Sequence, residues 1–400
     1  MKILFLTPQV PHPGVAGGHI LVYERMKRLA ERGHEVGLIS FEGTASAENI
    51  AALKPHLTEL VLSPPPRRHS PFLQLIRSAV MSTPPYFLDY RSREMMRLVG
   101  DVVERGKYQI VVAEFSAMGQ YLFRNPYLSA VRKVISCHFS IATSYRTVAA
   151  TYRVSSLGLR SRFGIPRLQR YEDAMYTGVD RVLVLTAHEM FSLQAADPSM
   201  RVQVVHSGVD TQRFQPPAVR SEDPVILFTG QFAMHPNVDA AAWFLRSMWP
   251  KLKKLHPRLT FLLVGPGSEE IKRRYARRQD RVVATGRVED VRPYLSKAWI
   301  FVCPVRLGSG LHFKLMEAMA MGLPVVTTSL GAEGIPMQTG EHCFIADRPD
   351  LMVSRISLLL EDHELRAAMA EKVRRLVVDQ FDWNTCVDHL ETILSDTLKH

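Results

Sequence analysis

The sequence lacks any long apolar run. None of its 400 residues belongs to a stretch of about 18 apolar residues, so no segment predicts a membrane-spanning helix. The apolar stretch after Met1 is too short for a secretory signal and runs directly into a glycine-containing loop over residues 8–18. We therefore expect a cytoplasmic protein.

Cysteine is scarce, and no metal-binding pattern is present. The four cysteines show neither the paired spacing of a redox site nor the spacing of metal ligands, which predicts free buried thiols. The 15 histidines include no His-x3-His pair flanking a glutamate. The sequence thus gives no support for a catalytic metal, and we expect none.

Acidic residues are few in one part of the chain. The net charge is +11, and residues 51–170 contain 18 Lys and Arg against 6 Asp and Glu, an excess of 12. Such a basic surface suits anionic lipid, a lipid diphosphate or nucleic acid, and a solvated arginine-rich surface is the simpler alternative. We expect no nucleic-acid partner, because the sequence has no recognisable nucleic-acid module and too few clustered aromatics.

Residues 299–326 show the most informative pattern in the chain. An apolar run of strand length, residues 299–304, precedes the turn Gly308-Ser309-Gly310, and residues 311–321 have helical spacing before Gly322 and Pro324 end the helix. The backbone N–H groups of Gly310 and Leu311 would open that helix, where the helix dipole favours an anion such as phosphate.

Glu317 lies further along this predicted helix, close to the face on which Gly310 lies. It lies seven residues beyond Gly310, about 10 Å along the axis and within roughly 20° of the same face. That separation resembles the span from the diphosphate of a nucleotide to its ribose hydroxyls. The alternative is a glutamate on a solvated helix face and a glycine that serves only a turn.

These residues resemble a known group of enzymes. Together with Lys314, the segments 317–328 and 331–334 are similar to the nucleotide-sugar site of family 4 glycosyltransferases of the GT-B fold, notably the sugar transferases of exopolysaccharide and exosortase-type systems. The family has two glutamates with seven residues between them, and the first position falls on Ser309. The resemblance assigns Glu317 to the ribose hydroxyls, whereas the role of the first glutamate on the donor sugar does not carry over.

The first half of the chain carries weaker parts of the resemblance. Residues 1–41 read as strand, loop, helix and strand, and Gly17 and Gly18 resemble the Gly-Gly loop that family members place against the donor diphosphate and the acceptor. His138 follows a predicted strand and fits the family histidine beside the reacting sugar. Plain structural roles are the alternatives for both features.

Two further segments of the first half have open interpretations. Residues 63–95 are rich in proline and arginine, and Phe72, Leu75, Ile76 and Ala79 fall at helical spacing. This segment predicts either an amphipathic helix packed on its domain or a contact with a membrane or a lipid-linked acceptor. Residues 146–170 contain no acidic residue and are interpreted as an acceptor-side loop and helix.

Alternating strands and helices continue through the second half and predict a second parallel sheet. The expected strands are residues 225–229, 260–264, 282–285 and 300–303, and the expected helices are residues 238–255, 268–278 and 291–297. Residues 206–214 resemble the family hinge. Gln231 and His235, after Gly230, stand where the family usually has arginine and lysine on the donor phosphates. Arg306 and Lys314 are therefore the expected cations at the diphosphate. Arg287 and Val288 resemble the segment that meets the nucleobase.

We thus predict an α/β protein of the GT-B class, with two Rossmann-like domains whose parallel sheets face each other across a cleft. Residues 1–213, with a C-terminal helix over 384–400 crossing back, form the acceptor domain, and residues 214–383 form the donor domain. The reaction implied by the resemblance is retaining, metal-independent and cofactor-free transfer of a sugar from a nucleotide-diphosphate donor to a hydroxyl of a saccharide or lipid-linked acceptor. Its setting would be surface or exopolysaccharide assembly, with peripheral contact to an anionic membrane left open.

The sequence leaves two alternative functions open. Ser309 and Gln231 depart from the family pattern and leave room for a catalytically inactive GT-B-like subunit that still binds a nucleotide sugar. The basic half leaves room for a nucleic-acid-binding protein, whose affinity would fall steeply with salt.

Overall fold

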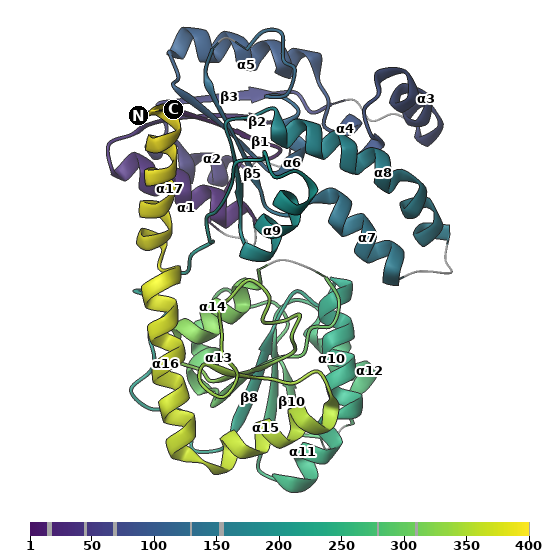
Figure 1. Cartoon of the computed structure of the whole chain (residues 1–400). Coiled ribbons are helices and arrows are strands. Elements are labelled where there is room, and N and C mark those ends of the chain that lie inside the picture. The colour runs from purple at the N-terminus through teal and green to yellow at the C-terminus, as the bar shows by residue number, and fades with distance from the viewer. Residues whose placement is uncertain are drawn as a thin grey trace. The chain divides into compact units, whose positions relative to one another are not determined.

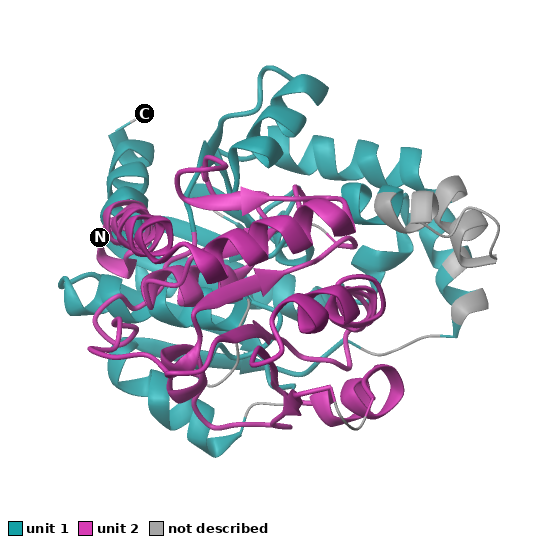
Figure 2. Ribbon diagram, turned by 90° about the horizontal axis from the view of Figure 1, so that it is seen from below, with its two compact units in different colours: residues 1–206, 386–400 teal, residues 207–385 magenta. Residues whose placement is uncertain are grey.

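The computed structural model describes residues 1–13, 18–43, 46–66, 70–128, 130–151, 156–277, 280–308 and 311–399. The chain divides into two compact units, coloured separately in Figure 2. Unit 1 comprises Met1–His206 and Cys386–His400, and unit 2 comprises Ser207–Thr385. The first division falls inside the predicted hinge segment, after His206 rather than after Arg213.

The described residues of unit 1 form a seven-stranded sheet in which neighbouring strands pair in parallel, in the order β3-β2-β1-β4-β5-β6-β7 (Figure 1). The strands are β1 (Lys2–Thr7), β2 (Glu35–Phe41), β3 (Glu59–Ser63), β4 (Ile110–Glu114), β5 (Arg132–Cys137), β6 (Arg181–Val184) and β7 (Val202–Val204). Every residue of β4 is buried, as expected of a central strand covered on both faces.

Helices cover both faces of this sheet. Successive residues of β1 enter different apolar clusters, Leu4 and Leu6 on one face and Ile3 and Phe5 on the other, because side chains alternate along a strand. The helices assigned here are α1 (Gly18–Glu31), α2 (Ala47–Leu53), the 3₁₀ turn η1 (Lys54–His56), α3 (Pro71–Met81), α4 (Pro85–Leu88), α5 (Arg93–Gly106), α6 (Ser116–Gly119), α7 (Ile141–Thr151), α8 (Ser156–Thr177) and α9 (Ala187–Ala196).

The last helix, α17 (Trp383–Lys399), completes unit 1 from the far end of the sequence. Leu390, Ile393 and Leu394 are buried in the same cluster as Ile3 and Phe5. Glu391 of this helix accepts hydrogen bonds from Arg32 and His34, beyond the end of α1. Figure 1 accordingly shows both chain termini in unit 1.

The described residues of unit 2 form a six-stranded parallel sheet in the order β10-β9-β8-β11-β12-β13. Its strands are β8 (Val225–Thr229), β9 (Thr260–Val264), β10 (Val282–Ala284), β11 (Ile300–Cys303), β12 (Val325–Thr327) and β13 (Cys343–Ile345). Its helices are α10 (His235–Ser247), α11 (Trp249–Leu255), α12 (Ser268–Tyr275), α13 (Arg292–Lys297), α14 (Phe313–Ala320), α15 (Pro349–Glu361) and α16 (His363–Phe381).

The expected α/β fold with two Rossmann-like domains is confirmed, as are β8, β9 and β11 with their predicted bounds. The single helix expected over residues 238–255 is wrong, because α10 ends at Ser247 and α11 begins at Trp249. Pro250 has no N–H to donate to the carbonyl of residue 246, which breaks the helix there.

The structure also settles two expectations about composition. Cys137, Cys303, Cys343 and Cys386 are all free and buried, as the spacing predicts. Within the described ranges, no helix has the length and apolar character that crossing a membrane requires.

Candidate functional sites in the two units

The strand order places one candidate site at a defined edge of each sheet. In unit 2 the order reverses at β8, which lies between β9 and β11. In unit 1 it reverses at β1, which lies between β2 and β4. Ligands of open parallel sheets bind outside the carboxyl ends of the strands at such a switch point. Predicted site residues lie after β8 and β11 in unit 2 and after β1, β4 and β5 in unit 1.

Gly230 ends β8 and lies against another backbone segment in unit 2. A Cβ on Gly265 would lie 2.1 Å from the carbonyl oxygen of Gly230, so the two loops approach at backbone distance. The amide of Asn237 donates to the carbonyl of Gln231 at 3.0 Å, which ties this loop to α10. The side chain of Gln231 is exposed, and His235, also exposed, begins α10.

Lys314 lies in the first turn of α14 and reaches Asn237, the α10 residue that binds this loop. Its Nζ donates to Asn237 Oδ1 at 2.5 Å and lies 4.7 Å from the ring centroid of Phe228, on β8. Burial lowers the pKa of Lys314, while Cys303 and Glu317 act in the opposite direction. The structure therefore places one half-buried ammonium group at the carboxyl ends of β8 and β11.

Glu317 is one turn further along α14. Burial raises the pKa of this carboxyl group to about 7, against the opposing charges of Arg213 and Lys314. Arg213 belongs to the predicted hinge segment, and Asp290 adds a smaller upward effect on the same pKa. A carboxyl group near its half-titration point at neutral pH is characteristic of functional sites, although structural ion pairs also produce such shifts.

Arg306 is positioned by α10. Its guanidinium forms hydrogen bonds with both carboxylate oxygens of Asp239, at 2.8 and 3.1 Å, and lies 4.5 Å from the ring centroid of Trp243. The charge of Arg306 is thus already paired, which distinguishes it from Lys314. Of the two cations predicted at the diphosphate, Lys314 is the one that forms no ion-pair contact with a carboxylate among the described residues.

The start of α14 differs from the prediction. The helix begins at Phe313, with His312 at its N-cap, rather than at Leu311. The axial distance from Gly310 to Glu317 that assumed a continuous helix is therefore wrong, because residues 311–312 are not helical. Leu311 itself is buried. Ser309 and Gly310 lie outside the described residues.

His312 was not singled out from the sequence. Burial lowers its pKa to about 4, so the imidazole is neutral at physiological pH. Its Nε2 is buried and has no hydrogen-bond partner within the described part of the chain, and the same holds for Thr229 Oγ1 at the end of β8. Buried polar atoms without partners are uncommon in proteins, and a ligand is one way to satisfy them.

The predicted nucleobase segment follows β10. Gly286 has a positive φ of 66°, donates its N–H to Ser268 Oγ at 2.9 Å, and accepts from the N–H of Gly265 at 3.2 Å. Arg287 is exposed and Val288 is half-buried immediately after this turn. Backbone contacts therefore hold the segment beside the loop that follows β9.

His138 in unit 1 is part of a buried charge network. Its Nε2 donates to Glu114 Oε2 at 2.7 Å, and Arg25 Nη1 binds Glu114 Oε1 at 3.3 Å and Ser136 Oγ at 2.9 Å. Burial alone would raise the pKa of Glu114, but Arg25 and His138 bring the net shift below the usual value. The ionised carboxylate thus fixes the orientation of the His138 ring, as the aspartate does for the histidine of a Ser-His-Asp triad.

Gly18, the first residue of α1, lies directly against this histidine. A Cβ there would lie 2.6 Å from the ring of Phe115 and 2.9 Å from His138 Nδ1. Phe115 follows β4 with an unusual φ of 68° and stacks on His138 with ring centroids 4.0 Å apart. Strained backbone of this kind concentrates at functional sites. Gly17 lies outside the described residues.

Gly18→Ala is expected to destabilise unit 1 by about 1–3 kcal/mol, because the added methyl group must displace Phe115 or His138. Gly164→Ala is the control, since a Cβ at Gly164 meets nothing within 4 Å and alanine is the better helix former in α8. Thermal unfolding of both variants checks the prediction. An unchanged melting temperature for Gly18→Ala would show that this contact relaxes without cost.

Two more histidines extend the cluster in unit 1. The rings of His12 and His19 stack with centroids 5.5 Å apart, and His19 lies 6.1 Å from Phe115. Burial lowers the pKa of His19, and the positive charges of His12 and His138 lower it further. No group of three or more His, Cys, Asp or Glu with metal-binding geometry occurs in the described ranges.

The sequence interpretation missed the partners of the predicted residues. Arg25 falls on the apolar face of its helix, three residues after Val22, and a charged residue at such a position signals a buried counter-charge. Glu114 ends a fully buried strand, which carries the same signal. Asn237 and Arg213 had no comparable signal.

Family models match both units. Residues 15–213 match the model described as "Glycosyltransferase Family 4", and residues 223–362 match "Glycosyl transferases group 1". An N-acetyl-alpha-D-glucosaminyl L-malate synthase of Bacillus anthracis is 25% identical over 414 residues, which covers 97% of this chain and 96% of the relative.

Solved structures share the fold. A sucrose-phosphate synthase from Thermosynechococcus elongatus matches with a TM-score of 0.72 at 17% identity, covering 99% of this chain and 98% of that one. HepE from Anabaena, solved in complex with UDP and glucose, matches with a TM-score of 0.64 at 16% identity, covering 99% of this chain and all of that one. The fold and the family matches together define an enzyme, a GT-B glycosyltransferase.

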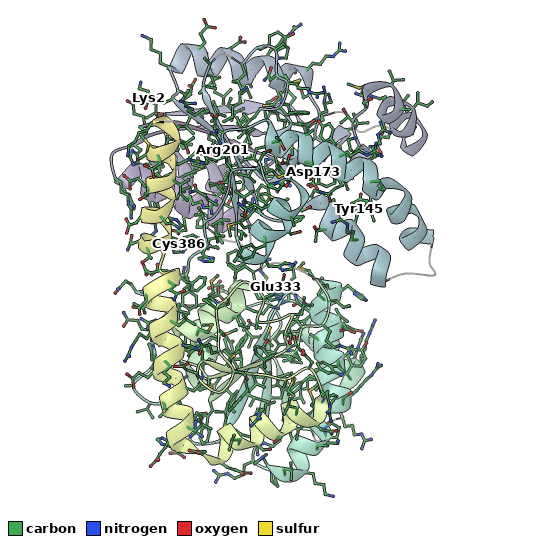
Figure 3. All side chains as sticks on the ribbon, in the orientation of Figure 1. Lys2, Tyr145, Asp173, Arg201, Glu333 and Cys386 are labelled. Carbon is green, nitrogen blue, oxygen red and sulfur yellow. The ribbon has the colours of Figure 1, made fainter. Side chains whose placement is uncertain are left out.

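Within that class, the chain belongs to the family 4 type, as the motifs around Lys314 and Glu317 indicate. Figure 3 shows the side chains of both units, with Glu333 of the family motif labelled in unit 2. The motif glycine Gly331 packs tightly, since a Cβ there would lie 2.2 Å from Thr327 Oγ1 at the end of β12.

Proposed function

We propose that this glycosyltransferase moves a sugar from a nucleoside-diphosphate donor to an acceptor hydroxyl, with the donor nucleotide held by unit 2. The observation that carries the proposal is the pair of half-buried ionisable groups on α14, Lys314 and Glu317, at the switch point of the unit 2 sheet. An ammonium group suits a diphosphate, and a carboxylate suits the paired hydroxyls of a ribose.

The unsatisfied atoms beside these groups support the same assignment. His312 Nε2 and Thr229 Oγ1 are both buried and without partners among the residues described. They flank the ends of α14 and β8, where Lys314 is held by Asn237. Polar atoms of this kind can bind the oxygens of a donor phosphate or sugar. HepE, a protein of the same fold, was solved with a nucleoside diphosphate and a sugar, UDP and glucose, bound to it.

His138 is the residue proposed for the sugar side of the reaction. Glu114 binds its Nε2, so Nδ1 is the nitrogen left to meet a hydroxyl group. In the transfer, the bond from the sugar C1 to the diphosphate oxygen breaks and a bond from C1 to the acceptor oxygen forms. The acceptor proton passes to the leaving phosphate oxygen, a route consistent with retention, and we identify no pair of carboxylates among the described residues of the candidate sites that would take it instead.

We further propose that neither a metal nor a cofactor takes part and that Lys314, with the amides at the start of α14, balances the charge of the leaving diphosphate. Saccharides or lipid-linked saccharides of surface or exopolysaccharide assembly are the proposed acceptors, following the motifs of residues 300–334. A cytoplasmic location, with unit 1 at an anionic membrane surface, belongs to the same proposal.

The donor site is tested by thermal unfolding with a panel of UDP, GDP, ADP, CMP and dTDP. A ligand at 100 times its dissociation constant adds about 2.7 kcal/mol to the free energy of unfolding. We expect one nucleotide to stabilise the protein, Glu317→Gln to lose most of that effect, and the exposed control Glu222→Gln to keep it. If no nucleotide of the panel stabilises the protein, the result contradicts the proposal and favours a subunit without a donor site.

The pH dependence gives a second test of Glu317. Its folded-state pKa of about 7 exceeds the usual 4.5, so its contribution to the stability of the free protein declines as pH rises from about 4.5 to 7. The carboxylate is the form that accepts from ribose hydroxyls, so nucleotide affinity should rise over roughly pH 6–8. Glu317→Gln should abolish this rise, and an identical rise in that variant would assign it to another group.

A further inference from the structure

Unit 1 contains a large cavity that is separate from the residues around His138. Its volume is about 700 Å³, within the range of small-molecule sites. The walls come from the end of α3 and the loop after it, from Arg91 after α4, from a turn after α6, and from the second half of α8. Figure 1 shows α3, α4 and α8 on the same side of unit 1.

The cavity is lined by four arginines and no carboxylate. Besides Phe123, Tyr171 and small residues, the lining contains Arg91, Arg124, Arg167 and Arg170. None of these four has an acidic partner among the residues that the structure describes. Other arginines of unit 1 do have one, since Arg25 pairs with Glu114, Arg28 with Glu24, Arg32 with Glu391, Arg105 with Glu59 and Arg132 with Asp180.

The carboxylates near these arginines in sequence are engaged elsewhere. Asp89, two residues before Arg91, accepts from the side-chain amide of Gln74. Glu172, next to Tyr171 on α8, accepts from Ser140 Oγ and from the first N–H groups of α7. Asp173, labelled in Figure 3, accepts from Gln169. The four guanidinium groups therefore repel one another in a shared cavity without an internal counter-charge, an arrangement that a bound anion would stabilise.

Local structure holds these groups in place. Arg167 donates to the carbonyl of Ser78 and so joins α8 to α3, and Arg91 donates to Thr83 Oγ1 at 3.5 Å. Arg124 has a φ of 51° and its guanidinium lies 4.7 Å from the Phe123 ring centroid. Ser82, also in the lining, has the same φ. Strained residues in a cavity wall are typical of a binding site.

We propose that this cavity binds a phosphate or diphosphate group. Arginine presents several planar donors that match phosphate oxygens, and each of the four uses few of its donors within unit 1. This site is additional to the donor diphosphate site at Lys314, and it does not depend on the transfer reaction.

The remainder of the ligand has apolar surface available to it. α3 forms one wall, and its Leu73, Ile76 and Val80 are 42%, 45% and 80% exposed, on one face of the helix. The expectation of an amphipathic helix packed on its domain is not met at Ile76 or Ala79, which are both exposed. The side chains of Phe72 and Leu75 lie outside the described residues. The phosphate could belong to a membrane lipid headgroup or to a soluble phosphorylated compound.

Calorimetric titration with inorganic pyrophosphate tests the site. The titration uses the full chain carrying Lys314→Gln, which removes the cation of the donor site. We expect saturable binding that Arg124→Gln and Arg170→Gln each weaken roughly tenfold, the effect of losing a charge-assisted hydrogen bond. Ala174→Phe, which fills the cavity without changing charge, should weaken binding similarly, whereas Arg105→Gln, outside the cavity, should leave it within about twofold.

Vesicles identify the source of the phosphate. Cosedimentation with vesicles of phosphatidylglycerol and phosphatidylcholine that Arg124→Gln and Ala174→Phe abolish would assign a lipid headgroup to the cavity. Pyrophosphate binding without vesicle binding would assign a soluble phosphorylated ligand. Two results would overturn the proposal. In the first, Arg105→Gln weakens binding as much as the cavity arginine variants do. In the second, no variant weakens binding.

Discussion

Lys314→Met should lower the rate constant kcat/KM for sugar transfer by about 10²–10³-fold, the effect of removing one preorganised group that stabilises developing charge. Lys314 is the cation at the switch point of unit 2 that has no carboxylate partner within the described ranges, since Arg306 is paired with Asp239. Without Lys314, the proposed diphosphate position would have only the neutral side chains of Asn237 and His312 beside it from α10 and the start of α14.

The measurement is release of the nucleoside diphosphate that the thermal panel identifies, with and without acceptor. Lys297→Met, at an exposed position in the last turn of α13, is the matched control and should leave the rate unchanged. Lys314→Arg should restore little, because a planar, longer guanidinium does not reproduce the compact ammonium that binds Asn237 Oδ1. A Lys314→Met enzyme that transfers sugar at the original rate would remove Lys314 from the reaction.

Arg25→Met should lower the free energy of unfolding at neutral pH by about 3–5 kcal/mol, the cost of leaving one partner of a buried ion pair alone. Arg25 is 2% exposed and Glu114 is fully buried, so water cannot solvate the Glu114 carboxylate once the guanidinium group is removed. Because Arg25 and His138 hold the pKa of Glu114 below its usual value, the pair contributes stability above that value and loses it as pH falls. The deficit of the variant should therefore shrink in acid.

Chemical denaturation at several pH values checks this expectation. Arg105→Met breaks an ion pair with an exposed arginine and should cost less than about 1 kcal/mol. If Arg25→Met fails to fold, Arg25→Met combined with Glu114→Gln should fold, because the amide removes the unpaired charge and keeps an acceptor for His138. A double variant no more stable than the single one would show that Arg25 acts through packing alone.

Much of the fold could be predicted from local pattern. Short apolar runs such as residues 225–229 and 300–303 have one stable place in a parallel sheet, and strand and helix alternate in the order that such a sheet needs. The failures have local causes. Pro250 divides a helix that periodicity alone would join, and the three-residue strands β12 and β13 carry too few side chains for their full bounds to be predicted.

The candidate sites were predictable only where a motif carried them. Glu317, Lys314 and His138 follow from matched segments, but no spacing predicts that Asn237 binds Lys314 or that Asp239 pairs with Arg306, because these contacts join residues about 70 positions apart or more. The arginine-lined cavity was still less predictable from the sequence. Its walls come from four separate stretches of unit 1, and the sequence shows only that acidic residues are rare there.

The discontinuous make-up of unit 1 has a consequence for biosynthesis. Its apolar cluster is closed by Leu390, Ile393 and Leu394 of α17, whereas unit 2 is continuous in sequence. A chain leaving the ribosome thus exposes the uncovered side of unit 1 throughout the synthesis of unit 2, and unit 2 can fold first. Completion of the N-terminal unit is therefore one of the last events in the maturation of this enzyme, and a chain that stops before residue 386 leaves that apolar surface open to chaperones and proteases.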